Sequence, residues 1–381
     1  MSARSAVTED FTFRFGCNPQ FVAGAPGRVN LIGEHTDYNE GFVLPMAIDR
    51  EICIAFRARD DDSVLLHSLD FDETVEVNLA HLQRGDHQWA EYLKGVAWVL
   101  RENAHNVNGW DGVIAGDVPR GAGLASSAAL ELVIMRAFAV ANRIDWRFDE
   151  AALAAQRVEN EWIGVQSGIM DQLVIASSEE GHAMLIDCRS LAVHHVPVPE
   201  RISVVVLDTG TRRRLGDTAY NQRRQQCEAA ADLLGAAALR DVTLTQLETH
   251  SGRMSDTLYR RARHVVTENG RTVAAAQALR VGNVVEVGRL MNDSHASLRD
   301  DFEVTNAALD LVVEMAQSHP ACFGARMTGA VFGGCAVAIV ENDRASQFIE
   351  KVTRDYLAGI GLESRAYICR AANGVSVTGT D

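Results

Sequence analysis

Hydrophobic residues in the first half of the chain gather in short runs between turn residues. The runs at 51–56 and 63–66 are rich in apolar residues, a pattern that predicts β-strands. Longer stretches repeat their apolar positions at the spacing of an α-helix. These stretches predict helices over 88–100, 127–141 and 150–162, with a further strand at 112–115.

The second half of the chain is richer in predicted helices. A strand is expected at 202–208 and another at 336–340, where β-branched residues follow one another. A final strand-like run lies at 364–369. Helical periodicity predicts long helices at 218–234, 256–278, 284–295, 303–318 and 344–357.

The order of these elements predicts an α+β fold, because strands and helices mix without the regular alternation of a doubly wound sheet. A chain of 381 residues is long for one domain, so two domains are expected. Short strand-like runs are common before Pro199 and Glu200, and long helical stretches are common after them. The predicted domain boundary therefore lies near residue 200. The predicted domains are therefore 1–199 and 200–381.

The net charge of the chain limits the kinds of partner that it can bind. The chain has 51 acidic and 36 basic residues, a formal net charge of −15. An acidic protein of this kind is poorly suited to bind nucleic acid or an anionic membrane. A nucleotide substrate is not excluded, because a local pocket can be positive on an acidic surface.

The seven cysteines are scattered and never form a Cys-x-x-Cys pair. Neither a disulfide framework nor a zinc site is indicated, and reduced thiols in a cytosol fit this pattern. Polar residues at 8–10 interrupt the N-terminal segment before a signal-peptide core could form, and no apolar run reaches the length of a membrane span. We therefore expect a soluble cytoplasmic protein.

The segment 27–38 is unusually polar and contains Arg28, Glu34, His35 and Asp37. It is too polar for a core strand and too rich in glycine for a stable helix, so a loop is predicted. The carboxylates and the imidazole can accept hydrogen bonds from a polyol, and the arginine can face an anion. The alternative is a charged loop in solvent.

A glycine-rich loop at 116–131 joins a predicted strand to a predicted helix. Glycines allow close approach of a ligand, and a helix start offers free amides for phosphate. It is not a Walker A loop, because neither lysine of the chain follows a glycine, and Ser126 replaces the third glycine of a dinucleotide fingerprint. Taken alone, the segment fits a serine-capped helix equally well.

These two segments and a third at 326–335 resemble the three signature motifs of the GHMP kinase superfamily, in the same order. Within it, the first segment closely matches the galactokinase signature Gly-Arg-x-Asn-Leu-Ile-Gly-Glu-His-x-Asp-Tyr. The resemblance extends over essentially the whole chain, from Ala25 to Cys335.

The resemblance implies a two-domain GHMP kinase fold. The N-terminal domain would have a ribosomal-protein-S5-like domain 2 fold and the C-terminal domain an α+β GHMP fold, with the active site in the cleft between them. It implies ATP-dependent phosphorylation of the anomeric C1 hydroxyl of D-galactose to α-D-galactose 1-phosphate, the step that opens the Leloir pathway. Magnesium would accompany ATP, and the protein would be a monomer or a weak homodimer.

The same resemblance implies roles for individual residues. Arg28 and Asp171 would be catalytic, and Ser127 and Glu159 would bind magnesium. The sugar would meet Glu34, His35, Asp37, Gly168 and Tyr220. The phosphates would meet the loop formed by Gly121, Ala122, Gly123, Leu124, Ala125, Ser126 and Ser127.

The chemistry of phosphoryl transfer agrees with these roles. The reaction needs in-line positioning and neutralisation of negative charge more than covalent help. Magnesium takes few protein oxygens, such as one serine and one glutamate, besides phosphate and water. Asp171 can accept the sugar proton, but Arg28 nearby would weaken it as a base, so Asp171 would act partly by orientation while Arg28 stabilises the phosphoryl group.

Two positions depart from the family pattern. Ser167 stands where the family usually has cysteine, a change of similar size. Val331 stands where the third motif usually has glycine, and a β-branched residue at positive φ would be strained by about 1–3 kcal/mol. We expect the chain to accommodate Val331 and to be active.

Two other functions compete with this interpretation. The first is a kinase for another monosaccharide, such as arabinose, N-acetylgalactosamine or glucuronic acid, because pocket shape alone separates such relatives. The second is a sugar- and ATP-binding regulator without catalysis. The complete run 126–129, together with Arg28 and Asp171, favours an enzyme.

Overall fold

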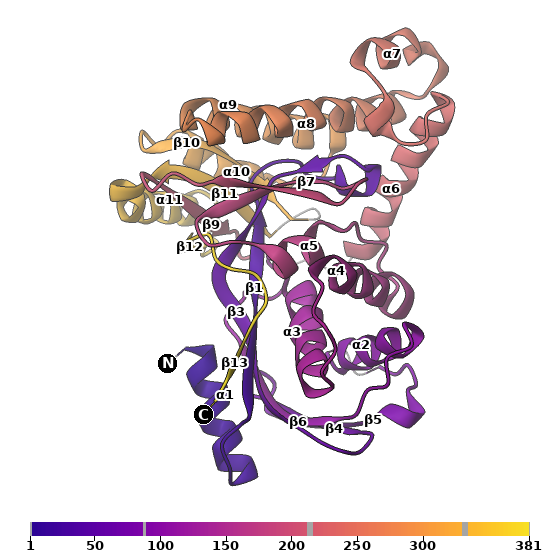
Figure 1. Ribbon diagram of the computed structural model, residues 1–381. Helices are drawn as coiled ribbons and strands as arrows, with labels where there is room; N and C mark the ends of the chain where they lie inside the picture. The colour runs from indigo at the N-terminus through magenta and orange to yellow at the C-terminus, as the bar shows by residue number, and fades with distance from the viewer. Residues whose placement is uncertain (1, 87–88, 212–215, 330–333, 381) are drawn as a thin grey trace.

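The structure is a computed structural model that describes residues 2–86, 89–211, 216–329 and 334–380, except the side chains of 216–218. Val331 lies outside the described residues. Three sheets form the framework of the described chain (Figure 1). Their strands are β1 (Phe21–Asn30), β2 (Phe42–Val43), β3 (Pro45–Ala58), β4 (Ser63–Ser68), β5 (Glu73–Asn78), β6 (Trp110–Gly116), β7 (His182–Asp187), β8 (Ala192–Pro197), β9 (Ile202–Asp208), β10 (Cys322–Thr328), β11 (Cys335–Glu341), β12 (Arg365–Cys369) and β13 (Ser376–Gly379).

The largest sheet has six strands in the order β13-β1-β3-β6-β4-β5. All its neighbours are antiparallel except β4 and β6, which run parallel. One face packs against α1 and the opposite face against α3, so strands β1 and β3 are covered on both sides (Figure 1). The helices of this half are α1 (Ala3–Phe15), α2 (Ala90–Glu102), α3 (Ser126–Ala141), α4 (Phe148–Arg157) and α5 (Met170–Ser177).

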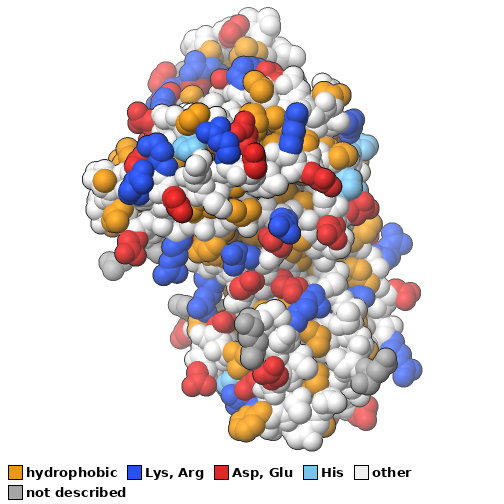
Figure 2. All heavy atoms as spheres, turned by 90° about the vertical axis from the view of Figure 1, so that its left-hand side faces the viewer, with side chains coloured by type: hydrophobic (Ala, Val, Ile, Leu, Met, Phe, Trp, Pro, Cys, Tyr) orange, Lys and Arg blue, Asp and Glu red, His pale blue; other side chains and the backbone are white. Residues whose placement is uncertain are grey.

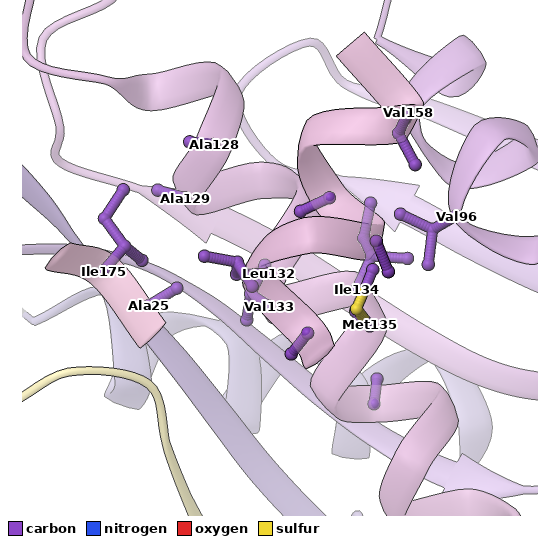
Figure 3. Packing of buried hydrophobic residues seen from close by; sticks show 14 of the residues in the cluster. Ala25, Val96, Ala128, Ala129, Leu132, Val133, Ile134, Met135, Val158 and Ile175 are labelled. Atoms are coloured by element: carbon purple, nitrogen blue, oxygen red, sulfur yellow. The ribbon is translucent and has the colours of Figure 1, made fainter. Parts of the chain in front are cut away.

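The core of this half lies between the sheet and α3. Figure 3 shows Leu132 and Val133 of α3 beside Ala25 of β1 and Ile175 of α5. All four side chains are fully buried. Because α3 begins at the glycine loop and α5 carries Asp171, this packing fixes two parts of the predicted site relative to β1.

The second sheet is antiparallel, with strand order β10-β11-β9-β12. Both α9 and α10 pack against β10, and α8 packs against α9 and the short third sheet β2-β7-β8. The helices of this half are α6 (Gly216–Leu233), α7 (Leu244–Thr249), α8 (Asp256–Arg280), α9 (Val284–Ser297), α10 (Ala307–Gln317) and α11 (Ala345–Ile360).

Short 3₁₀ and π turns connect these elements. Two of them matter for the site: the 3₁₀ turn Asp37–Asn39 after β1, and the π turn Val158–Ile163 that continues α4. The other turns are Leu79–His81, Leu239–Asp241, Ser251–Arg253, Leu298–Phe302 and Asn342–Arg344. None of the helices in the described parts of the chain has the length and apolar character needed to span a membrane.

The α+β class and the predicted helices and strands are confirmed, with some boundaries corrected. The helix predicted from residue 303 begins only at Ala307, because Glu303 has a left-handed φ of 52° and Asn306 caps the helix. The helix predicted over 150–162 ends at Arg157, before the π turn. The sequence prediction missed the helices α1, α5 and α7 and the strands β1, β2, β5, β7, β8, β10 and β13.

The loop predicted at 27–38 is wrong for its first four residues. They form the end of β1, and Arg28 and Asn30 are buried there. A buried strand tolerates such polar side chains when each has a partner. Arg28 pairs with Asp171, and Asn30 pairs with Glu34.

The domain division at residue 200 stays a prediction. The gap between β8 and β9 coincides with the predicted boundary. The last strand, however, returns to the first sheet, where Val377 pairs with Ala23. The final residues therefore pack with the first half of the chain, although they follow the second half in sequence (Figure 1).

Candidate active site

A bidentate ion pair between Arg28 and Asp171 lies at the centre of the site. Arg28 donates from Nε to Oδ1 of Asp171 at 2.7 Å and from Nη2 to Oδ2 at 2.6 Å. Its third nitrogen, Nη1, donates to the carbonyl of Gly123 at 2.5 Å. The two residues predicted to be catalytic therefore meet, and the arginine also contacts the glycine loop.

The glycine loop approaches the third motif closely. Gly123 and Gly329 both have positive φ, 75° and 90°, and a Cβ on Gly123 would lie 3.1 Å from Cα of Gly329. Only glycine fits this approach. The loop is also tied to β1, because the amide of Arg28 donates to the carbonyl of Leu124 at 3.1 Å.

The helix that follows the glycine loop is not capped by a serine side chain. Its N-cap residue is Ala125, which has a φ of 57° and no side-chain capping bond. The serine-capped alternative is therefore wrong. An N-terminus without such a cap leaves helix amides to meet an anion, beside the hydroxyls of Ser126 and Ser127.

Glu34 is buried against a charged partner from the third motif. Its Oε2 accepts from Nη2 of Arg326 at 2.7 Å and from Nδ2 of Asn30 at 3.2 Å. Burial raises the pKa of Glu34, while the positive charges of Arg326 and Arg28 partly oppose that rise. One carboxyl oxygen is thus held in place, so that the group can present the other to a ligand.

His35 sits in an aromatic cluster. It has a left-handed φ of 64°, and its Nδ1 lies 2.9 Å from the hydroxyl of Tyr38. Its ring centroid is 4.7 Å from that of Phe302 and 5.8 Å from that of Tyr220. Tyr220 also packs edge-to-face on Tyr38 at 5.3 Å, so residues 35, 38 and 220 form one wall.

Asp37 lies directly against Gly168. A Cβ on Gly168 would fall 1.9 Å from Oδ2 of Asp37, so no larger residue fits there without movement. Burial raises the pKa of Asp37 to about 7, and repulsion by the carboxylate of Asp171 adds to the rise. The site thus brings carboxyl groups together that cannot easily all be charged.

Tyr220 completes the same cluster. Burial raises the pKa of its hydroxyl well above the usual range, and a hydrogen bond with the backbone of Gly168 opposes the rise. The charges of Asp37 and Asp171 also act on this hydroxyl. All five residues predicted to hold a sugar therefore surround one small region beside Asp171.

The predicted magnesium ligands also meet. Glu159 accepts from the hydroxyl of Ser167 at 2.5 Å and from Nε2 of Gln172 at 3.1 Å. Burial raises its pKa, while hydrogen bonds from Ser167 and Ser127 partly oppose that rise. Ser127 and Glu159 thus offer two neighbouring hard oxygen donors. The described residues contain no cluster of three or more His, Cys, Asp and Glu side chains suited to a metal.

Comparison with known proteins identifies the family. The family models that match are the galactokinase galactose-binding signature at residues 9–58, the GHMP kinases N terminal domain at 91–179 and the GHMP kinases C terminal domain at 275–358. A galactokinase of Roseiflexus sp. (strain RS-1) is 46% identical over 374 residues, covering 97% of this chain and 96% of that protein. The chain belongs to the galactokinase family.

Further relatives agree with this assignment. A galactokinase of Chloroflexus aurantiacus is 46% identical over 378 residues, covering 98% of this chain and 97% of the relative. The crystal structure of Lactococcus lactis galactokinase complexed with galactose superposes with a TM-score of 0.94 at 36% identity, covering 98% of this chain and 99% of that chain. Methanococcus jannaschii mevalonate kinase, at 18% identity and a TM-score of 0.65 (92% and 98% covered), shares the fold.

Sequence reasoning missed an aromatic pocket in this galactokinase-family chain. A cavity of about 210 Å³ opens beside Ser126 and Ser127. Phe71 and Trp89 stack in its wall with centroids 6.1 Å apart and planes 5° apart. Its described lining also includes Ile52, Ser68, Asp70, Tyr92, Ile114, Arg120 and Leu130. These residues come from several separate elements and form no local motif.

Two buried charged residues, Arg326 and Glu131, were also missed. Arg326 lies within the third motif, but no role was assigned to it. A fully buried arginine in an otherwise apolar strand is a signal for a buried acidic partner, which here is Glu34. Glu131 of α3 is fully buried, and burial beside the carboxylate of Glu159 raises its pKa well above the usual range.

Proposed function

We propose that the chain catalyses ATP-dependent phosphorylation of the C1 hydroxyl of D-galactose, giving α-D-galactose 1-phosphate and ADP. The observation that carries the proposal is the Arg28–Asp171 pair, which joins the cluster of Glu34, His35 and Asp37 to the glycine loop. Membership of the galactokinase family and the likeness to a galactokinase complexed with galactose support the choice of sugar.

The proposed sugar site combines fixed carboxyl groups with an aromatic wall. Glu34 and Asp37 supply acceptors for hydroxyl groups, and Tyr220 with His35 closes the side of the pocket. Gly168 lets the sugar and Asp37 approach the backbone. A pocket of this kind selects a sugar by the positions of its hydroxyl groups.

In the proposed reaction, the C1 oxygen attacks the γ-phosphorus and the bond to the ADP oxygen breaks. The carboxylate of Asp171 accepts the hydroxyl proton and orients the nucleophile. Because Arg28 holds both oxygens of Asp171, the carboxylate contributes orientation of the nucleophile as well as proton acceptance. Arg28 also stabilises the negative charge of the transferring group.

Ser127 and Glu159 would hold magnesium in the proposed reaction. The donor set fits the metal, since a hydroxyl and a buried carboxylate are neighbouring oxygen ligands and phosphate with water can complete the shell. When bound, the ion neutralises charge on the phosphates. Ser167 and Gln172 hold the carboxylate of Glu159 toward this position.

The nucleotide base would occupy the aromatic pocket. That pocket borders Ser126 and Ser127, and the amides at the start of α3 would meet the phosphates. Phe71 and Trp89 give flat apolar surfaces suited to a purine. Arg120, whose guanidinium lies 4.6 Å from the ring centre of Phe71, adds positive charge at the same mouth.

We also propose a cytoplasmic location and a monomer or weak homodimer. All seven cysteines are free, which suits a reducing compartment. The most exposed large apolar side chains, Phe13, Val281 and Val285, lie on α1 and around the start of α9, far apart in the fold. On the face in Figure 2, apolar side chains are spread among charged ones, unlike a large obligate interface.

The proposal is tested by measuring ADP release with ATP and magnesium across galactose, talose, arabinose, N-acetylgalactosamine, glucuronic acid and glucose. Rapid turnover on galactose with phosphate on C1, seen by phosphorus NMR, is expected. Turnover on a different sugar alone would keep the mechanism and replace the substrate. Binding of ATP and galactose without turnover on any sugar would favour the regulator instead.

A further inference from the structure

Three side chains of α8 hold the backbone of the loop that carries Glu34, His35 and Asp37. Glu268 accepts from the amide of Gly33 at 3.0 Å. Nε2 of His264 lies 3.0 Å from the carbonyl of Glu34. Asn269 accepts from the amide of Phe42 at 2.9 Å. The anchors are thus more than 220 residues away in sequence and bind main-chain atoms at both ends of the loop, residues 33–42.

His264 acts as a hydrogen-bond donor here. Its partner at Nε2 is a carbonyl, which can only accept, so Nε2 carries the proton and Nδ1 accepts from the hydroxyl of Ser297 at 2.9 Å. The ring is fully buried and packs, tilted, against Phe302 with ring centroids 4.6 Å apart. Burial lowers the pKa of His264 to about 4, so the ring is neutral near pH 7.

Glu268 is a buried carboxylate with donors on both oxygens. Oε1 accepts from Gly33 and from the hydroxyl of Ser294 at 2.6 Å, and Oε2 accepts from Nε of Arg271 at 2.7 Å. Burial alone would raise its pKa, but the charge of Arg271 and its other positive neighbours outweigh burial and lower it to about 2. His264 and Glu268 are four residues apart, so one face of α8 presents both.

The loop needs such support because its backbone is strained. His35 and Glu40 have left-handed φ values of 64° and 57°, and neither is glycine. Such conformations persist only where the surroundings fix them. The three anchors flank these residues, with Gly33 and Glu34 held before His35 and Phe42 held after Glu40. The loop side chains remain available to the sugar.

We propose that His264, Glu268 and Asn269 are positioning residues for sugar binding. They fix the backbone of loop 33–42, so that Glu34, His35 and Asp37 meet the sugar in one arrangement. The inference rests on the proposed function of these three loop residues. The anchors touch no substrate themselves, and α8 comes from the opposite half of the chain.

The test compares paired variants at two anchors. His264→Leu removes the donor to Glu34, whereas His264→Gln keeps an N–H at a similar reach. Asn269→Leu removes the acceptor for Phe42, whereas Asn269→Asp keeps it. Nδ2 of Asn269 has no hydrogen-bond partner among the described residues, so the aspartate loses no bond.

Both leucine variants should raise KM for galactose about tenfold, the effect of losing one buried hydrogen bond, with KM for ATP unchanged. The glutamine and aspartate variants should recover most of the loss. Hydrogen exchange of the amides in residues 33–42 should accelerate in the leucine variants alone. Thr267→Ala is the matched control, because within the described parts of the chain the hydroxyl of Thr267 bonds to carbonyls of α8 alone.

A lower melting temperature with unchanged KM for galactose and unchanged exchange in residues 33–42 would overturn the inference, since that result marks a purely structural role. If His264→Leu fails to fold, the comparison of Asn269→Leu with Asn269→Asp tests the inference by itself. Asn269 is only half-buried, so its variants should fold. A wild-type chain that does not phosphorylate galactose would instead overturn the proposed function. The exchange measurement still tests the anchors in that case.

Discussion

Arg326 of β10 donates from Nη2 to Oε2 of Glu34 at 2.7 Å, and both side chains are almost completely buried. The two residues are 292 positions apart in sequence. Glu34 belongs to the first motif and Arg326 opens the third. This ion pair therefore joins the proposed sugar site to the strand that leads to Gly329, which lies close to Gly123. The bond engages Oε2 of Glu34, so Oε1 is the oxygen that the proposed sugar would meet.

Arg326→Met should lower the free energy of unfolding by about 3–5 kcal/mol, because it leaves the charge of Glu34 buried without its partner. Denaturant unfolding measures this change. The double variant with Glu34→Gln should recover part of the stability, since the buried charge is then absent. A loss in the double variant equal to the sum of the losses in Arg326→Met alone and Glu34→Gln alone would show that the pair is not coupled.

Asp37 should make stability depend on pH. Its pKa in the folded chain is about 7, above the ordinary value of 3.8 that applies when unfolded. Between these values the folded state binds more protons than the unfolded state, so stability is greatest below about pH 4 and falls as the pH rises through 7. The expected loss from this group is about 2 kcal/mol, because solvent reaching the side chain reduces the full effect.

The measurement for Asp37 is chemical denaturation of the wild-type chain and of Asp37→Asn from pH 5 to pH 8. The asparagine variant cannot ionise there, so its stability should fall less over this interval. The difference between the two curves isolates Asp37 from other groups that titrate in the same range. Parallel curves would contradict the raised pKa.

Gly168→Ala should raise KM for galactose at least tenfold, because the new methyl group would displace Asp37. KM for ATP should stay within about twofold of the wild type. Gly270→Ala is the control. Gly270 has open space around its Cα within α8, so alanine there should leave KM unchanged and stabilise the helix by about 0.5–1 kcal/mol. If Gly168→Ala and Gly270→Ala had similar KM values for galactose, the close contact between Gly168 and Asp37 would not matter for sugar binding.

The parts of the site that lie within short motifs were predictable from sequence. Residues 28, 34, 35 and 37 lie in one segment, and the glycine content of 116–131 predicts the glycine loop. The helical spacing of apolar residues likewise predicted the bounds of α3, α8 and α9 to within about two residues. The structure brings the predicted residues together, and their roles stay proposals until they are measured.

The parts of the fold and of the site that the sequence did not predict depend on contacts between distant segments. The strand β1 extends through Arg28, whose charge is balanced by Asp171, 143 residues later. Local polarity therefore favoured a loop. The anchors on α8 bind main-chain atoms, which leave no trace in the identity of the loop residues. The strand β13 is short and partly exposed, so its pairing with β1 has no strong pattern.

Asp171→Asn should lower kcat by a factor of about 10²–10⁴, the usual range for loss of a positioned acid–base group. The side chain keeps its shape and one acceptor for Nε of Arg28, so ATP and galactose affinities, measured by calorimetry, should change little. Asp355→Asn, on the exposed face of α11, is the control and should have wild-type turnover. Because the substituted amide cannot accept a proton but can still accept a hydrogen bond, the residual kcat separates the two contributions. A loss below tenfold would assign Asp171 to orientation of the sugar hydroxyl and leave Arg28 with most of the transition-state stabilisation.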